Sequence, residues 1–257
     1  MGGRLRLTRT RGARSLPSYG KDLAYVHHVG FTDFARGAAP GVLALLRAAR
    51  LTTGLVVDLG CGSGVWAREL LGAGYSVLGV DSSASMVALA RETAPAATFR
   101  RGSVHELPIP PCAAVTSLGE VLGYLPDESP TRESLAPLFR RVAASLAPGG
   151  LFVFDLMIRG GAHPMGYRTW TRGDGWSVEA EVREDTRRAL LTRDITTFRR
   201  VGRLYRRSDE RHAVRLFARA EVERWLRASG FTVRVTRRYG SFPLAPRRLA
   251  FIARKPR

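Results

Sequence analysis

The chain has 257 residues, 45% of them hydrophobic, and a formal net charge of +19. This length supplies one well-buried domain, or one domain with an inserted subdomain. The two cysteines, Cys61 and Cys112, form neither a CxxC pair nor a cluster with metal-ligand spacing. No apolar stretch is long enough to span a bilayer and no apolar signal core opens the chain, so we expect a cytoplasmic protein without a structural metal or a membrane partner.

The positive charge is almost entirely arginine, which supplies 39 of the 41 basic residues. Codon bias in a GC-rich genome accounts for such a preference. Residues 159–257 nevertheless hold 24 arginines and Lys255 against ten acidic residues, which leaves nucleic acid or an anionic substrate open. Residues 1–20 carry five arginines and no acid, a pattern that predicts a disordered basic arm, with a mitochondrial presequence as the alternative.

Two short helices are predicted within residues 21–51, the first in "DLAYVHHVGFTDFARG" and the second opened by Pro40. After Gly54 apolar strand runs alternate with amphipathic helices. The strands are "LVVDLG", "SVLGVD", "TFRRGS", "AAVTSLG" and "LFVFDLM", and the helices cover residues 65–71, 83–91 and 132–146. Such a βαβ series predicts a parallel sheet with helices on both faces.

The helical period disappears over residues 157–217, where hydrophobic and polar residues alternate. This pattern predicts an antiparallel β insertion with turns near residues 173–175, 185–188 and 201–202. The α/β pattern then resumes with a helix stopped by Gly230 and two final strands, "TVRVTRRY" and "RRLAFIARK".

The segment "VVDLGCGSG" ends a strand with three glycines in five positions, Gly60, Gly62 and Gly64. Glycine lets a ligand approach the backbone closely, and free N–H groups at the following helix start favour a polar or negative group. A dinucleotide fingerprint would have the spacing GxGxxG, whereas this loop has GxGxG preceded by Asp58. A carboxylate there favours an ammonium group, so the ligand is expected to be zwitterionic.

The second strand ends at Asp81, in "VLGVDSSASM", where an acid can accept hydrogen bonds from both hydroxyls of a ribose. With these two motifs the chain resembles the class I S-adenosylmethionine-dependent methyltransferases over about residues 52–156 and 218–257. The resemblance implies a Rossmann-like, seven-stranded, mostly parallel sheet flanked by helices, with the antiparallel β insertion after strand five. Residues 21–51 would then be a helical lid, and residues 157–217 would cover the substrate site.

The resemblance also implies how S-adenosylmethionine is held. Asp58 and the glycine loop would bind the methionine part, Asp81 the ribose, and Ser103 stands where the family usually has an acid that contacts adenine. The full set of expected cofactor-binding residues is Asp58, Gly60, Cys61, Gly62, Gly64, Asp81, Ser82, Met86, Gly102, Ser103, Leu118 and Gly119.

Three residues are candidates for catalysis. Glu120 and Tyr124 are expected one helical turn apart, so that Glu120 contacts the cofactor amino group or acts as a base while Tyr124 lines the substrate pocket. His212 shares a strand face with Glu210, which would orient it as a general base. The alternative interpretations are a helix cap for Glu120 and a core aromatic for Tyr124. For Glu210 and His212 the alternative is a pair on the protein surface.

Four further residues are candidate substrate contacts. Tyr25 and His28, three apart on one helix face, would form a lid over the cofactor. Trp170 and Tyr239, with Trp176, would form pocket wall near the insertion. For all of them, interior packing is the alternative interpretation.

We therefore expect a methyltransferase that acts on a nitrogen or oxygen nucleophile of a small-molecule acceptor by in-line methyl transfer. One alternative is an RNA or DNA methyltransferase, which the local arginine excess favours, but "SLGEVLGYL" stands where an Asn/Asp-Pro-Pro-aromatic motif would be expected. The other is a non-catalytic protein that only binds S-adenosylmethionine. The sequence does not indicate an oligomeric state.

Overall fold

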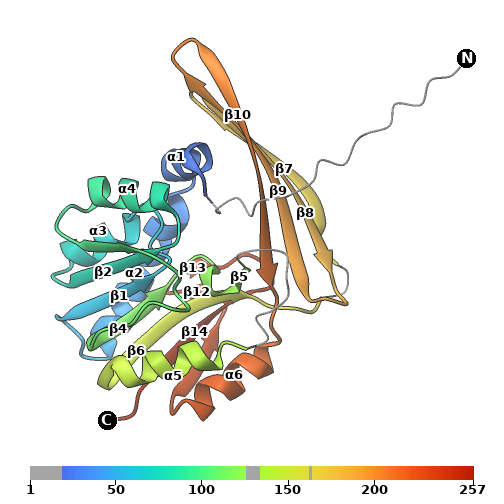
Figure 1. Ribbon diagram of the computed structural model, residues 1–257. Coiled ribbons are helices and arrows are strands. Elements are labelled where there is room, and N and C mark those ends of the chain that lie inside the picture. Colours follow the sequence, from blue (N-terminus) through green and yellow to red (C-terminus); the bar gives the residue numbers. More distant parts are fainter. Residues whose placement is uncertain (1–18, 126–133, 162–163) are drawn as a thin grey trace, which may run out of the picture.

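The computed structural model describes residues 19–125, 134–161 and 164–257. They form a seven-stranded sheet flanked by helices and a second, five-stranded sheet that projects from it (Figure 1). Most of the predicted basic arm lies outside the described residues, which begin with Tyr19 and Gly20. Among the described residues, no helix has the length and apolar character needed to cross a membrane.

The seven-stranded sheet has the order β11-β14-β6-β4-β1-β2-β3. Its strands are β1 (Leu55–Leu59), β2 (Ser76–Asp81), β3 (Thr98–Arg101), β4 (Cys112–Ser117), β6 (Leu146–Met157), β11 (Thr232–Thr236) and β14 (Arg248–Arg254). β14 runs antiparallel to both β6 and β11, and the pairs from β6 to β3 are parallel. The predicted seven-stranded, mostly parallel sheet is confirmed, although β6 begins at Leu146, earlier than the predicted strand "LFVFDLM", which starts at Leu151.

Helices cover both faces of this sheet. One hydrophobic cluster joins it to α2 (Asp33–Ala48), α3 (Val65–Gly72) and α4 (Ala84–Thr93), and a second cluster joins the other face to α5 (Ala136–Ser145) and α6 (Arg219–Ala228). The predicted helix over residues 132–146 falls partly outside the described residues, and α5 accounts for the remainder. The parallel strands are buried on both faces, which explains why they are almost continuously apolar.

The predicted division of residues 21–51 at Pro40 is wrong. α1 (Lys21–Gly30) ends before residues 31–32, and Pro40 lies exposed inside α2. On the opposite side of α2, a Cβ added to Gly41 would lie 2.3 Å from the carbonyl carbon of Tyr239, in the hairpin of β12 (Arg238–Tyr239) and β13 (Phe242–Pro243). Gly41 thus allows α2 to pack closely against this hairpin, and the helix continues through Pro40.

The five-stranded sheet has the order β5-β10-β9-β8-β7, with every pair antiparallel. Its strands are β5 (Tyr124–Leu125), β7 (Gly166–Gly173), β8 (Trp176–Asp185), β9 (Leu190–Val201) and β10 (Leu204–Arg215). The antiparallel character of the insertion is confirmed. β5 follows the short 3-10 helix η1 (Val121–Gly123) and ties this sheet to the carboxyl end of β4.

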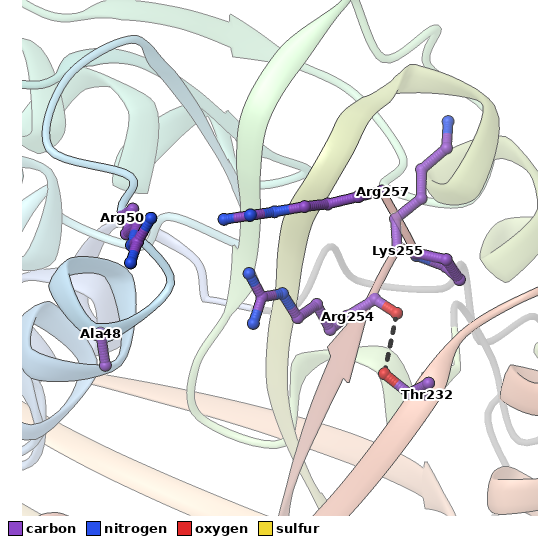
Figure 2. Close-up of a pocket in the computed structure, with 7 residues that line it drawn as sticks. Ala48, Arg50, Thr232, Arg254, Lys255 and Arg257 are labelled. Atoms are coloured by element: carbon purple, nitrogen blue, oxygen red, sulfur yellow. Dashed lines mark hydrogen bonds between the residues drawn. The ribbon is translucent and has the colours of Figure 1, made fainter.

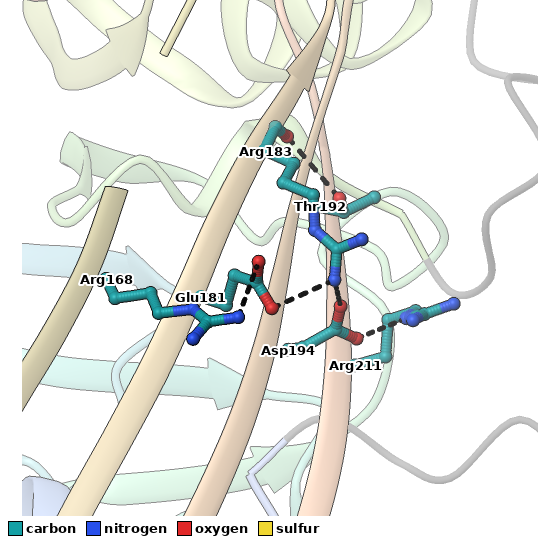
Figure 3. Close-up of polar contacts among 6 residues, drawn as sticks. All are labelled: Arg168, Glu181, Arg183, Thr192, Asp194 and Arg211. Carbon is teal, nitrogen blue, oxygen red and sulfur yellow. Dashed lines mark hydrogen bonds and ion pairs between the residues drawn. The ribbon is translucent and has the colours of Figure 1, made fainter. Parts of the chain in front are cut away.

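The two faces of the five-stranded sheet differ in what they carry. Its outer face bears a row of directly opposed charged residues across four strands, with Arg183 between two carboxylates (Figure 3). The members of the row are Arg168, Glu181, Asp194 and Arg211. Because side chains alternate along a strand, the neighbours of these residues point to the inner face, where Arg193 lies directly opposite His212.

Candidate active site

A cavity of about 920 Å³ lies at the carboxyl ends of β1, β2 and β4, between them and the inner face of β9 and β10. α1 packs against α4, β8 and β9 and so bridges the two sheets. On the side of the seven-stranded sheet the lining includes Asp58, Gly60, Cys61, Gly62, Asp81, Ser82, Met86, Ser103, Leu118, Gly119 and Glu120. On the other side it includes Tyr19, His27, Tyr124, Arg193, Ile195 and His212.

The glycine loop and Asp81 are locked to each other. Gly62, at a φ of 52°, donates its N–H to Oδ2 of Asp81 at 2.9 Å, and Ser83 donates its N–H to Oδ1 at the same distance. A Cβ on Gly62 would meet no atom within 4 Å, so the loop backbone is open to a ligand. Burial raises the pKa of Asp81, against the lowering by these backbone donors.

Two of the expected cofactor residues do not line the cavity. A Cβ on Gly64 would lie 2.9 Å from Cα of Ala90, so Gly64 allows α3 and α4 to pack closely. Gly102 donates its N–H to the carbonyl oxygen of Asp81 at 2.9 Å and supports the strand that carries this acid. Gly64 and Gly102 thus support the elements around the cavity, and their predicted contact with the cofactor stays a prediction.

Asp58 is 2% exposed and lies beneath the glycine loop. Its Oδ1 accepts a hydrogen bond from Thr116 Oγ1 at 2.8 Å, and Thr116 in turn accepts one from Trp66 Nε1 at 3.0 Å. Burial raises the pKa of Asp58 to about 7, and the negative charge of Asp81 adds to this effect. A cationic group in the cavity would reverse this shift by favouring the ionised carboxylate.

Asp155, fully buried at the end of β6, organises the turn after β4. It accepts the N–H groups of Gly119 and Glu120 at 3.0 and 2.8 Å, the hydroxyl of Tyr239 at 3.0 Å, and Nε of Arg248. These bonds hold Glu120 at a φ of 57°, a left-handed conformation that non-glycine residues adopt only when their surroundings impose it.

Glu120 and Tyr124 do come together, but not on a helical turn as the sequence analysis expects. Glu120 precedes η1 and Tyr124 lies in β5. They meet through Arg193 of β9, whose Nη2 lies 2.9 and 3.0 Å from the two carboxylate oxygens of Glu120 and whose Nη1 donates to the Tyr124 hydroxyl at 3.0 Å. Although burial lowers the pKa of Arg193, Tyr124 and Glu120 outweigh that effect and raise it. Glu120 is therefore half of an ion pair between the sheets.

His212 and Glu210 form a buried pair, with side chains 1% and 8% exposed, rather than the surface pair of the alternative. Nε2 of His212 lies 2.9 Å from Oε2 of Glu210. Glu210 also accepts the N–H groups of Tyr19 and Gly20 at 2.8 and 2.9 Å. A carboxylate only accepts hydrogen bonds, so this pattern assigns the proton to Nε2 and leaves Nδ1 with a lone pair. Among the described residues, Nδ1 has no hydrogen-bond partner.

The two residues of α1 that were expected to form a lid lie away from the cavity. Neither Tyr25 nor His28 lines the cavity, whereas His27 does. The ring of Tyr25 packs under the guanidinium of Arg199, 3.5 Å away, which directs it toward β9. Burial lowers the pKa of His27 to about 4, so this imidazole is neutral at physiological pH.

The aromatic residues expected as pocket wall also lie elsewhere. Trp170 is 62% exposed on the edge strand β7, and Trp176 packs with Leu23 and Val26 of α1. Tyr239 is buried and acts through its bond to Asp155. Trp176 and Tyr239 therefore pack in the interior, as the alternative interpretation expected, whereas Trp170 does not.

Several residues that line the cavity were not predicted from the sequence, among them Tyr19, His27, Arg193 and Arg248. Arg248 opens β14, and its guanidinium packs 4.1 Å from the ring centre of Phe34 while Nε bonds Asp155. Its Nη2 is buried without a hydrogen-bond partner among the described residues. Only Arg193 carries a usable sequence signal, because strand alternation combined with the β9–β10 register would place it beside His212.

Within the described ranges no group of three or more His, Cys, Asp or Glu side chains is arranged to hold a metal ion. The side chains that line the cavity can hydrogen-bond and pair charges, and His27 and His212 bring imidazole rings to it. The glycine loop with Asp58 and Asp81 makes up one wall, and His212 with Tyr124 the other. A ligand on the first wall would therefore face an imidazole and a phenol on the second.

Comparisons with known proteins agree with this arrangement. Residues 56–150 match the family model of a methyltransferase domain. A dTDP-3-amino-3,6-dideoxy-alpha-D-glucopyranose N,N-dimethyltransferase of Streptomyces fradiae is 27% identical over 212 residues, which cover 81% of each chain. A trans-aconitate 2-methyltransferase of Methylobacterium nodulans is 38% identical over 104 residues, covering 39% of this chain and 37% of that protein.

Solved structures share the fold over nearly the whole chain. Streptomyces venezuelae DesVI superposes with a TM-score of 0.76 at 22% identity, covering 93% of this chain and 100% of that one. The sugar N-methyltransferase KedS8 from Streptoalloteichus gives a TM-score of 0.76 at 18% identity and covers both chains completely. The methyltransferase-domain match spans the glycine loop and Asp81, so residues 56–150 resemble a methyltransferase domain, and the chain shares the fold of these solved structures.

Proposed function

We propose that this methyltransferase transfers a methyl group from S-adenosylmethionine to an amine nitrogen of a small-molecule acceptor, with His212 as the general base. The observation that carries the proposal concerns His212, which lines the same cavity as the glycine loop and Asp81 and whose buried Nδ1 has no hydrogen-bond partner among the described residues. The Streptomyces fradiae relative, whose name states N,N-dimethylation of an amino sugar, supports the choice of nitrogen.

The side chains of the cavity complement the charged groups and the ribose of S-adenosylmethionine. Asp58 offers a buried carboxylate for the ammonium group of the methionine end. Arg248 offers an unpartnered Nη2 for the carboxylate of the same end. Asp81 retains lone pairs for ribose hydroxyls beside its two backbone donors. The opposite charges of Asp58 and Arg248 therefore match a zwitterionic ligand. A neutral ligand would leave both side chains without a counter-charge.

Bound there, S-adenosylmethionine supplies an electrophilic methyl group, which bonds to the acceptor nitrogen while the carbon–sulfur bonding pair stays on sulfur. The chain's own residues must then orient the acceptor and exclude water. Tyr19 closes the cavity beside His212, with its hydroxyl 3.3 Å from that of Tyr124 and its ring centre 5.0 Å from that of His212.

His212 has one defined task in this scheme. An amine attacks only as the free base, so an acceptor that enters as an ammonium ion must first lose a proton. Nδ1 of His212 takes that proton, and Glu210 stabilises the resulting imidazolium through Nε2. A hydroxyl acceptor would also use this base, whereas a carboxylate acceptor would gain nothing from it.

The proposal also assigns a role to each segment of the chain. Residues 52–156 and 218–257 hold the donor, and residues 157–217 cover the acceptor. Residues 21–51 supply His27 to the cavity and Phe34 beneath Arg248. The acceptor is expected between Tyr124, Arg193 and His212, where the two sheets meet.

The test is production of S-adenosylhomocysteine with matched acceptors: amino sugars, the same sugars with hydroxyl in place of the amine, and dicarboxylic acids. The proposal expects turnover with an amino sugar and at least tenfold less with its hydroxyl analogue. Turnover confined to carboxylic acids would contradict the assignment of nitrogen and of a general base, and turnover confined to RNA would contradict a small-molecule acceptor.

A further inference from the structure

A second cavity, of about 460 Å³, lies at the edge of the seven-stranded sheet opposite the active site. It is formed where α2 ends, β11 begins and β14 ends (Figure 2). Its lining residues are Ala48, Arg50, Thr232, Arg254, Lys255, Pro256 and Arg257, among which no residue is acidic. Figure 2 shows Arg254 and Arg257 extending from the end of β14 toward Arg50.

Three arginines line this second cavity. Within the described part of the chain, Arg50, Arg254 and Arg257 have no side-chain hydrogen bond or ion pair. Lys255 differs, because its Nζ donates to the carbonyl oxygens of Ala143 and Leu146 at 2.7 Å each. Lys255 thus fixes the end of β14 to the rest of the sheet, while the arginines beside it keep free donors.

Arg50 also occupies a backbone position that favours glycine. It has a φ of 63° immediately after α2, where its N–H donates to the carbonyl of Arg47 at 2.9 Å and that of Leu51 donates to Leu46 at 3.0 Å. This is the Schellman pattern, whose left-handed residue is usually glycine. An arginine held there in a strained conformation points to a use for its side chain.

We propose that Arg50, Arg254 and Arg257 form a binding site for a small polyphosphate anion, such as pyrophosphate or the diphosphate of a nucleotide. Guanidinium forks bind phosphate oxygens in pairs, and three positive charges together match the charge of a polyphosphate better than that of a single phosphate group. The C-terminal end of α2 carries partial negative charge and opposes an anion, so binding needs the combined charge of all three. The site is separate from the donor cavity and does not depend on the proposed function.

The test is calorimetric titration of the intact protein with sodium pyrophosphate at low ionic strength. R50G removes one guanidinium and at the same time relieves the left-handed strain, so it is expected to fold at least as well as the parent protein. Its affinity for pyrophosphate is expected to fall at least tenfold, and that of R254Q likewise. R68Q removes an equal charge from the exposed surface of α3 and is expected to change the affinity less than twofold.

Titration with S-adenosylhomocysteine separates this site from the active site, because R50G is expected to bind it as the parent protein does. Three results would overturn the proposal. They are absence of pyrophosphate binding to the parent protein at millimolar concentration, equal losses in R50G and R68Q, and tighter Arg50-dependent binding of a short DNA duplex than of pyrophosphate. The last would identify nucleic acid as the partner of this surface.

Discussion

Nε2 of His212 lies 2.9 Å from Oε2 of Glu210, on a carboxylate that two backbone N–H groups also bind. This contact turns the imidazole so that Nδ1 is the atom without a partner among the described residues. The orientation rests on residues from the start of the described chain and from β10. His212 lines the donor cavity although its side chain is only 1% exposed.

The first prediction concerns this pair. E210Q places an amide beside Nε2, and an amide N–H can donate to that nitrogen, which moves the imidazole proton to Nδ1 and removes the base. We expect kcat for an amine acceptor to fall about 100-fold, and H212Q to lose as much or more. Because neither change touches the donor wall, affinity for S-adenosylhomocysteine should stay within about threefold. Unchanged kcat in E210Q would remove the assigned tautomer from the mechanism.

The donor wall could be predicted from the sequence because its residues are close together along the chain. Asp58, Gly60 and Gly62 follow one strand, and Asp81 ends the strand beside it. Adjacent parallel strands deliver their carboxyl ends to one edge, so a local motif fixes a three-dimensional site. The central strands β1, β4 and β6 were predictable because burial on both faces leaves an apolar run of characteristic length.

The acceptor wall depends on long-range packing that the local pattern does not carry. Glu120 meets Arg193 across 73 positions, and Tyr19 meets Glu210 across 191. His27 rather than His28 lines the cavity, in a helix that packs against the distant strands β8 and β9. Trp170 is a residue type that often lines pockets, but it lies on an edge strand whose residues are all exposed.

A second prediction follows from the pKa of Asp58, which is about 7 in the free protein. Its carboxyl must lose a proton to pair with the ammonium group of the donor, so affinity for S-adenosylhomocysteine should rise with pH and level off above about 7. Between pH 8 and pH 6 we expect roughly a tenfold loss. Calorimetry across this range checks it. D58N should bind weakly at every pH, and retention of the same pH dependence in D58N would exclude Asp58 as its source.

A third prediction concerns Arg248, whose Nη2 is assigned to the donor carboxylate. R248M should weaken binding of S-adenosylhomocysteine at least tenfold. 5′-Methylthioadenosine shares the adenosine part but has no amino-acid end, so its affinity should change less than twofold. General disruption of the site through Asp155 would weaken both ligands equally, and that outcome would contradict the assignment.

The fourth prediction concerns the ion pair between Glu120 and Arg193, whose side chains are 14% and 16% exposed. R193M leaves Glu120 without its counter-charge in a largely buried place and should lower the free energy of unfolding by roughly 2 to 3 kcal/mol. The double variant E120Q/R193M should recover part of this loss, because no charge is then left unpaired. Chemical denaturation of R193M, E120Q and the double variant measures the three losses of stability. If the loss in the double variant equals the sum of the losses in the single variants, the two residues do not interact.

The most direct test of the account is titration of the parent protein and of D81A with S-adenosylhomocysteine, with circular dichroism to verify that both are folded. Asp81 fixes the glycine loop through Gly62 and is assigned to the ribose hydroxyls. The account predicts one-to-one binding to the parent protein and at least tenfold weaker binding to D81A. A folded parent protein that does not bind S-adenosylhomocysteine, or a D81A variant that binds it equally well, would contradict it.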